Sequence, residues 1–348
     1  MFEVWFAIVA VMFTGYVVLD GYDLGAGAVH LFVARTGDER RQALAAVGPF
    51  WDANEVWLLA AGGALFVGFP RVLAVGLSGF YLAIFLVLWT LVLRGVAIEF
   101  RSHVNDALWR SFWDAVFAIA SALLAILWGA AIGNVIRGLP LGANGWFALA
   151  LFTDFSARPP VGILDWYTVL TGVFALVALV GHGSVFLAWR TDGPVHDRAR
   201  TLARWVFIAL AVLWPLVTLA THVVNPTLLP ALPGRPLAWL GVLMAIGGLV
   251  AVFVGLARGR PLMAFLGSSA WLTGMLVATA ACLFPVMLRA VPDAAYSITA
   301  SDSGNTAAGL RTALGWWSVG FPIVIVYFAI LFRLHRGKAV AAAEGKGY

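Results

Sequence analysis

Long apolar stretches separated by short polar segments make up most of this sequence. A helix needs roughly 20 consecutive apolar residues to cross the hydrocarbon core of a membrane. Nine stretches reach about this length, and they cover residues 3–33, 49–69, 72–93, 112–134, 164–189, 203–224, 236–257, 263–287 and 313–335. The pattern therefore predicts an all-α, polytopic membrane protein with about nine transmembrane helices.

Charge supports this class and predicts an orientation. Charged residues make up 11% of the chain, whereas soluble domains carry roughly 25%. Of the 22 lysines and arginines, 16 lie after the first, third, fifth and seventh stretches or in the C-terminal tail. Because basic residues are enriched in cytoplasmic loops, we expect the N-terminus outside and the C-terminus in the cytoplasm.

A short internal repeat indicates how the stretches are grouped. GAVHLFVARTGD (27–38) resembles GSVFLAWRTDG (183–193), and each closes an apolar stretch before a basic loop. Chance or the shared loop charge explains so short a match nearly as well. We expect two four-helix bundles, over 1–140 and 141–290, with the acidic motifs in the first. Residues 291–348 would then form an extracytoplasmic loop, the last helix and a cytoplasmic tail.

Several kinds of site are excluded by residue usage. The single cysteine, Cys282, cannot build a disulfide or a thiolate cluster, and no metal site is expected. The basic residues are spread over short loops without interleaved aromatics, so we expect no nucleic-acid partner. A lone histidine in an apolar stretch, such as His30, His182 or His222, favours a hydrogen bond between helices over haem ligation.

Four acids lie inside or at the ends of the first two apolar stretches. Asp20 and Asp23 are three residues apart, and so are Asp52 and Glu55, so each pair occupies one helix face. An ionised acid in the middle of a membrane helix costs about 2.5–3.5 kcal/mol, which makes such residues rare without a partner or a task. Helices joined by a short loop usually pack together, so we expect the four acids to face a common interior.

Two interpretations of these acids compete. As structural residues, they would bond to neighbouring helices or to Arg94 and Arg101, or cap helix ends. Asp52 would then serve the first turn after Pro49. As functional residues, they would conduct protons inward from the cytoplasm. The functional interpretation is favoured for Asp23 and Asp52, the two are balanced for Glu55, and the structural one is favoured for Asp20.

A second charged cluster follows the third stretch, in LRGVAIEFRSH (93–103). Arg94, Glu99 and Arg101 would lie where this stretch reaches the cytoplasm. One interpretation is a basic membrane anchor with a surface ion pair. The other is that Arg94 pairs with Asp52 or Glu55 and holds that acid charged and oriented.

Several motifs resemble one family over nearly the whole chain. GYDLGAG, GPFWDANEVWLLAAGGALFVGFP, LRGVAIEFR and WGAAIGNVIRGLP are similar to the N-terminal half of subunit II of cytochrome bd-type quinol oxidases. HGSVFLAWRTDG and SITASDSGNTAAGL resemble later segments of the same family. The block around Asp52 is long and unusual, and it also contains Trp51, Asn54 and Trp57. The chain departs from the family's usual pattern at Ala53, often glycine there, and at Glu55, which is glutamine in some relatives.

The resemblance implies a multi-subunit terminal oxidase of the respiratory chain in a bacterial cell membrane. Such a complex oxidises quinol, reduces dioxygen to water and generates proton motive force. It implies a similar subunit I that ligates two haems b and one haem d, so that this chain carries no catalytic residue or cofactor itself. It allows a small single-helix accessory subunit, together with bound lipid and quinone. It also implies that Asp52 and Asp23 belong to a cytoplasmic proton path.

Two other functions remain open on the sequence. A proton-coupled secondary transporter would also carry acids within its helices and an internal repeat. A purely structural subunit would use the same acids to hold helices together and to stabilise its partner. A transporter would need a substrate cavity between discontinuous helices, and the sequence shows no matched pair of short broken stretches. Neutralising mutations would distinguish a structural subunit from a proton path.

Overall fold

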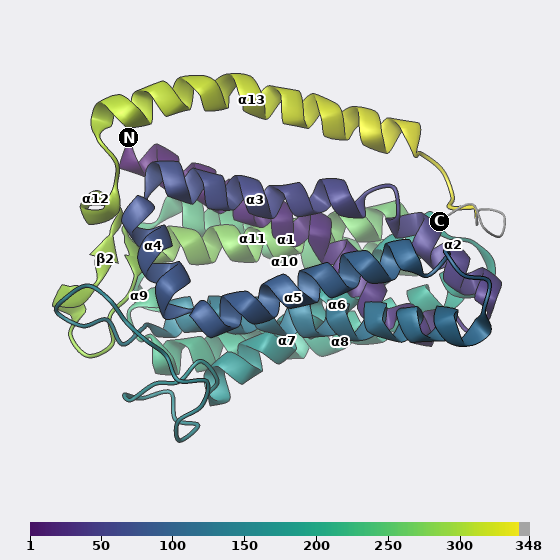
Figure 1. Ribbon diagram of the computed structural model, residues 1–348, viewed down its shortest axis with the longest axis horizontal. Coiled ribbons are helices and arrows are strands. Elements are labelled where there is room, and N and C mark those ends of the chain that lie inside the picture. Colours follow the sequence, from purple (N-terminus) through teal and green to yellow (C-terminus); the bar gives the residue numbers. More distant parts are fainter. Residues whose placement is uncertain (341–348) are drawn as a thin grey trace.

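The computed structural model describes residues 1–340, and nearly all of its long helices run along one axis (Figure 1). Nine helices of 18 residues or more form the bundle within this range: α1 (Phe2–Val33), α3 (Trp51–Gly68), α5 (Tyr81–Phe100), α6 (Ala107–Arg137), α7 (Trp166–Arg190), α8 (Gly193–Val224), α10 (Pro236–Ala257), α11 (Pro261–Leu283) and α13 (Ala307–Leu334). Eight are long and apolar enough to cross a membrane, and α3 is the exception. Its first two turns carry Asp52, Asn54 and Glu55, which lower its hydropathy.

Short elements close the two ends of the bundle. They are α2 (Gly37–Val47), α4 (Pro70–Gly79), α9 (Leu228–Ala231), α12 (Ala300–Ser303), the 3₁₀ turns η1 (Leu232–Gly234) and η2 (Ala294–Tyr296), and the antiparallel strands β1 (Val286–Leu288) and β2 (Ile298–Thr299). We call the end that carries α2 the α2 end, and the opposite one the α9 end. In Figure 1 the α2 end is on the right and the N-terminus lies at the α9 end.

The predicted third stretch, residues 72–93, is wrong as a single helix. The chain breaks at Phe80, where ψ is 21°, so α4 ends at Gly79 and α5 begins at Tyr81. Both pieces are apolar, so hydropathy cannot reveal the break. Because α5 then continues to Phe100, Arg94 lies inside this helix rather than beyond its end.

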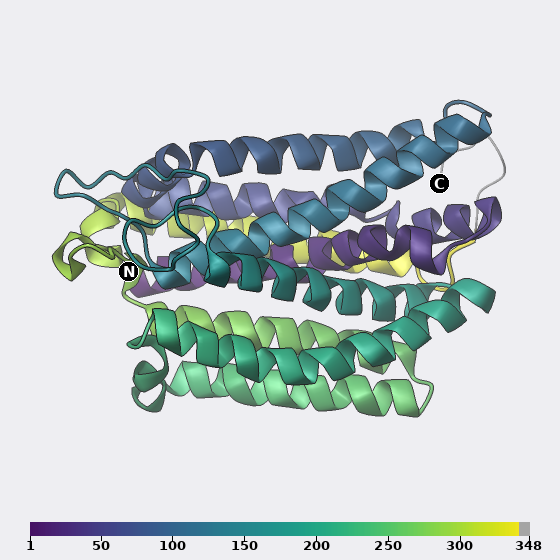
Figure 2. The same ribbon diagram turned by 90° about the horizontal axis from the view of Figure 1, so that it is seen from below.

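The loops that carry most of the basic residues lie at one end of the bundle, because consecutive long helices run in opposite directions. The last residues of α1, α5, α7, α10 and α13 all lie toward the α2 end (Figures 1 and 2). Lys346 and the rest of residues 341–348 lie outside the described residues. The proposed side of the membrane remains a prediction, and so does the division into units 1–140, 141–290 and 291–348.

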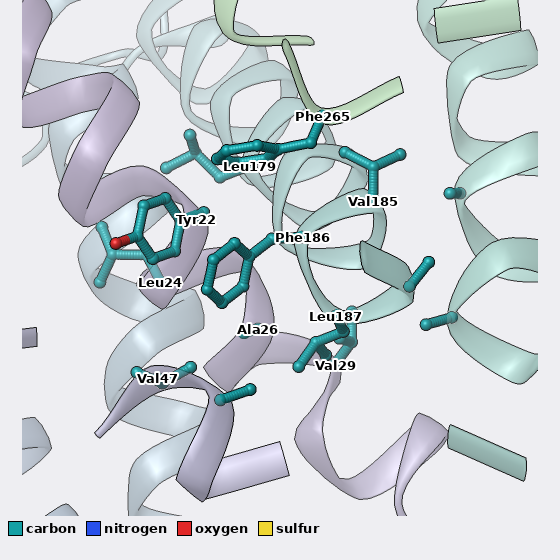
Figure 3. Packing of buried hydrophobic residues seen from close by; sticks show 14 of the residues in the cluster. Tyr22, Leu24, Ala26, Val29, Val47, Leu179, Val185, Phe186, Leu187 and Phe265 are labelled. Carbon is teal, nitrogen blue, oxygen red and sulfur yellow. The ribbon is translucent and has the colours of Figure 1, made fainter. Parts of the chain in front are cut away.

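The helices α1 and α7 form the centre of the bundle. Figure 2 shows them between a group made of α3, α5 and α6 and a group made of α8, α10 and α11. A Cβ atom on Gly25 would lie 1.8 Å from the carbonyl oxygen of Leu179, so the two backbones touch and no side chain fits there. Tyr22 of α1 stacks on Phe186 of α7 at 4.0 Å, with Phe265 of α11 beside them (Figure 3). This contact fixes the helix face of α1 that carries the acids.

Candidate functional site

Two of the four predicted acids contact one arginine, and a third, Asp23, lies one helical turn from the first of them. Arg94 of α5 is fully buried, and its Nη1 lies 2.7 Å from Oδ1 of Asp20, which is also fully buried. Its Nη2 donates a hydrogen bond to Oε1 of Glu55, whose side chain is 26% exposed. Arg94 therefore joins α5 to both α1 and α3 through two carboxylates. We call Asp20, Asp23, Glu55 and Arg94 the acid cluster.

Asn54 connects α3 to the second acid of α1. Its side-chain amide donates to Oδ2 of Asp23 at 2.7 Å, and the hydroxyl of Tyr22 and the carbonyl oxygen of Leu19 lie at 2.8 and 3.2 Å from the same nitrogen. Asp23 and Asn54 are both buried. Within residues 1–340, Oδ1 of Asp23 and Oδ1 of Asn54 have no hydrogen-bond partner. Buried polar atoms of this kind commonly bind ordered water.

The charges in this cluster do not balance when every group is ionised. Arg94 contributes one fixed positive charge, since a guanidinium stays protonated in proteins. Asp20, Asp23 and Glu55 would contribute three negative charges in a mostly buried volume. Like charges that share a site favour the uptake of a proton by one of them. The arrangement is therefore chemically suited to hold and exchange protons.

Asp52 lies apart from this interior. It is exposed on α3, one turn before Glu55, toward the α2 end. The expectation that all four acids face a common interior is thus wrong for Asp52. An exposed acid one turn from a partly exposed one does, however, link the surface of the chain to the acid cluster.

The other residues of the Asp52 block serve packing. Trp57 is buried, and its ring fills the space beside Gly15 of α1, where a Cβ would lie 2.4 Å from it. Its ring also contacts Phe328 of α13 at 5.5 Å. Trp51 is half-buried and lies over Gly95 of α5. These contacts fix the distances of α3 from its neighbours.

The expected surface anchor at residues 94–101 is a buried structure instead. Arg94 pairs with Glu55, as one interpretation predicted, and also with Asp20 rather than with Asp52. Arg101 is 3% exposed and binds Asp114 of α6 through two hydrogen bonds of 2.6 and 3.2 Å. Glu99 lies on the exposed face of α5. The cause of the difference is that α5 continues to Phe100, so Arg94 lies within the helix and Arg101 directly follows it.

Asp114 is a residue that the sequence reasoning missed. It is 1% exposed and also accepts from Arg40 of α2 at 3.1 Å, while His30 of α1 bonds to it at 2.8 Å. The available signal was one acid near the start of the apolar stretch 112–134. A second missed set lies at the α9 end, where buried Arg137 bonds to Asp165 and Asn134.

The segment α2 is fastened across the α2 end of the bundle. Glu39 forms a capping box with Thr36 and accepts two hydrogen bonds from Arg198 of α8, at 2.8 and 3.0 Å. The hydrogen bonds from Arg198 lower the pKa of Glu39 to about 2. Glu39 therefore stays ionised and holds α2 to α8 through the whole physiological pH range.

Two of the three histidines within apolar stretches, His30 and His182, bond to neighbouring helices as the sequence predicted, whereas His222 is exposed. His182 bonds to the carbonyl oxygen of Val18 at 2.9 Å and to the hydroxyl of Ser268 at 2.7 Å. His30 bonds to Asp114, and its ring packs edge-on against Phe117. Among the described residues, no group of three or more His, Cys, Asp or Glu side chains could hold a metal ion.

Comparison with known proteins gives one consistent family. The family model for cytochrome bd terminal oxidase subunit II matches residues 1–335. Cytochrome bd-I ubiquinol oxidase subunit 2 of Escherichia coli K12 is 30% identical, over 94% of this chain and 92% of that protein. Cytochrome bd ubiquinol oxidase subunit 2 of Bacillus subtilis 168 is 31% identical, over 89% and 88%.

A solved structure supports the fold separately. The bd oxidase from Geobacillus thermodenitrificans matches with a TM-score of 0.74 and 16% identity, over 96% of this chain and 98% of that chain. The membrane-spanning helices, the family model and the relatives all agree. The chain therefore belongs to the cytochrome bd terminal oxidase subunit II family, and it is a multi-pass membrane subunit of an oxidoreductase complex.

Proposed function

We propose that this subunit supplies protons to the oxygen-reducing centre of the oxidase through Asp52 and the acid cluster. The complex would take these protons from the cytoplasm while quinol is oxidised on the other side of the membrane, which makes the reaction electrogenic. The haems, two of b type and one of d type, would be ligated by subunit I. The engaged histidines of this chain support that assignment. The haems supply electron transfer and oxygen reduction.

The route would begin at the surface. Exposed Asp52 takes up a proton at the α2 end and passes it to Glu55, one turn further along α3. Glu55 and Asp20 both contact Arg94, so a proton gained by either carboxylate changes the charge that Arg94 must balance. Asp23, held by Asn54, is the last acid along this route. The observation that carries the proposal is the pairing of one buried guanidinium with two carboxylates, the buried Asp20 and the partly exposed Glu55, with the buried Asp23 one helical turn from Asp20.

The assignment of sides rests on the basic end of the bundle. Arg35, Arg40 and Arg41 follow α1, and Arg198 and Lys338 lie at the same end. We therefore place the α2 end in the cytoplasm and the N-terminus outside. Lipid, quinone and a small accessory subunit would bind the complex in addition to subunit I.

A purely structural role is the main competing function. Arg94 and Asn54 tie α5 and α3 to α1, so removing these side chains would also disturb the packing. Asp52 is exposed, so its replacement tests proton transfer with little structural change. The family assignment argues against the alternative function of a proton-coupled transporter, which rested on the same acids and on the weak internal repeat.

The test is Asp52→Asn in the complete oxidase reconstituted into liposomes. We expect oxygen consumption and charge separation to fall about tenfold or more, because a proton carrier contributes about 10²–10⁴-fold when it is essential. The matched control is Asp38→Asn, an acid on α2 whose side chain is 83% exposed and which pairs with Arg41. Unchanged turnover, or failure of the variant complex to assemble, would contradict the proton role.

A further inference from the structure

One buried carboxylate, that of Asp114, joins four elements at the α2 end. It accepts two hydrogen bonds from Arg101 of α5, accepts one from Arg40 of α2, and bonds to His30 of α1. Asp114 and His30 are each 1% exposed, and Arg101 is 3% exposed. A carboxylate that binds a guanidinium with both oxygens fixes the direction as well as the distance of its partner.

The clamped arginine lies on the same face of α5 as the arginine of the acid cluster. Arg94 and Arg101 are seven residues apart, so they differ by only about 20° around the helix and by roughly 10 Å along it. A rotation of α5 that moved one guanidinium would therefore move the other. Fixing Arg101 fixes where Arg94 points.

Few apolar contacts set the rotation of α5 relative to α1 and α3. Its main packing partner is α6, the helix that carries Asp114. Its opposite face is rich in exposed apolar side chains, including Phe85, Leu88 and Trp89. Toward α1 and α3, α5 presents Arg94, with Gly95 under Trp51. Polar contacts at residues 94 and 101 therefore act together with the packing of Ala97 and Ile98 against Leu44 and Phe117 to set its rotation.

We propose that Asp114 is a positioning residue for proton uptake: it clamps Arg101 and so holds α5 with Arg94 between Asp20 and Glu55. This inference rests on the proposed function, because Arg94 matters for turnover only when the acid cluster carries protons. It adds a role for a residue that touches none of the three carboxylates. Arg40 and His30 complete the clamp by holding α2 and α1 to the same carboxylate.

The first test is structural and independent of turnover. The complete oxidase carrying Asp114→Asn would be imaged by cryo-electron microscopy beside the wild type. We expect Arg94 to leave contact with Asp20 or Glu55 as α5 rotates. The matched control is Asp106→Asn at the N-cap of α6, where asparagine caps as well as aspartate and Arg94 should not move. An unmoved Arg94 in the Asp114→Asn oxidase would overturn the inference.

The second test compares charge separation in Asp114→Asn, Arg94→Gln and the double variant. We expect each single variant to lose about tenfold, since a displacement of about 1 Å costs up to 10²-fold. If Asp114 acts through Arg94, the double variant is no slower than Arg94→Gln alone. Losses that multiply would show an independent role and overturn the inference.

A further variant covers the case in which Asp114→Asn does not assemble. Arg101→Lys keeps the ion pair but cannot bind both carboxylate oxygens as a planar fork does. We expect it to assemble with charge separation lowered by at least about twofold and to add no further loss to Arg94→Gln. Wild-type charge separation in Arg101→Lys would overturn the inference. If Arg94→Gln separates charge at the wild-type rate, the proposed proton path is wrong. The position of Arg94 in the map of the Asp114→Asn oxidase then still tests whether Asp114 holds α5 in place.

Discussion

The side-chain amide of Asn54 donates a 2.7 Å hydrogen bond to the buried carboxylate of Asp23 and so fastens α3 to α1. A leucine at position 54 has a similar size but cannot donate. We expect Asn54→Leu to lower the stability of the complex by about 1–3 kcal/mol, because Asp23 loses its donor inside the bundle. Thermal unfolding of the purified oxidase would measure this loss.

A control for this change is available in a loop at the α9 end. Asn144 is exposed, and Asn144→Leu leaves the acid cluster untouched. We expect the control to unfold at the wild-type temperature. Equal unfolding temperatures for both variants would show that the bond between Asn54 and Asp23 contributes nothing to stability.

Gly183 of α7 lies against the backbone of α1. A Cβ at this position would lie 2.1 Å from the backbone nitrogen of Ala26, so Gly183→Ala must push the two helices apart. We expect a loss of about 1–3 kcal/mol or more from overpacking, and lower turnover because α1 carries two of the acids. Gly247→Ala on α10 is the control, since no atom lies within 4 Å of its added Cβ. A Gly183→Ala complex as stable as this control would contradict the close packing of α1 on α7.

The contact of Glu39 with Arg198 makes a prediction about pH. The pKa of Glu39 is lowered from 4.5 to about 2, so its bond stabilises the folded state above pH 4.5. This contribution is lost as the pH falls from 4.5 toward 2, because Glu39 then takes up a proton. We expect Glu39→Gln to unfold with a smaller temperature difference between pH 5 and pH 3 than the wild type. An identical difference in both would show that Glu39 does not couple folding to pH.

At the α9 end, Arg137 and Asp165 form a buried pair between α6 and the N-cap of α7. Arg137→Met leaves the carboxylate of Asp165 without its counter-charge, which costs about 3–5 kcal/mol for a buried pair. We expect low yields of assembled oxidase for this variant. Adding Asp165→Asn removes the unpaired charge and keeps an N-cap, so the double variant should recover part of the yield. A double variant with a lower yield than Arg137→Met would contradict this account.

The long helices could be predicted because their apolar stretches are continuous, but their exact ends depended on local backbone geometry. Phe80 breaks the third stretch between two equally apolar pieces, so composition carried no sign of it. At its other end α5 continues past residue 93 to Phe100, so Arg94 lies within a helix, although the sequence placed it near a surface.

The acids were visible in the sequence, and so was Arg94 as a partner of Glu55, whereas Asn54 as the donor to Asp23 was not. Asp20, Asp23 and Glu55 stand out because acids are rare in apolar stretches. Asp52 and Glu55 have the same spacing as Asp20 and Asp23, yet Asp52 is exposed. Spacing predicts that two residues lie on one helix face, but it does not predict whether another helix covers that face. Asp114 is bonded to His30 and Arg40, which lie more than 70 residues away in the sequence, and pairing over such separations cannot be read from local patterns.

The outermost helix, α13, has a consequence for how the chain is made. It lies at the edge of the bundle (Figure 1), and Leu310 and Phe328 are its only buried residues. After it, the backbone nitrogen of Ala339 bonds to the carbonyl oxygen of Arg190, and Lys338 bonds to that of Thr191. Since ribosomes release the N-terminal segments first, α1 to α11 can close before α13 emerges. The helix α13 can therefore add to a bundle that has already formed, and Lys338 and Ala339 then bind it to the end of α7.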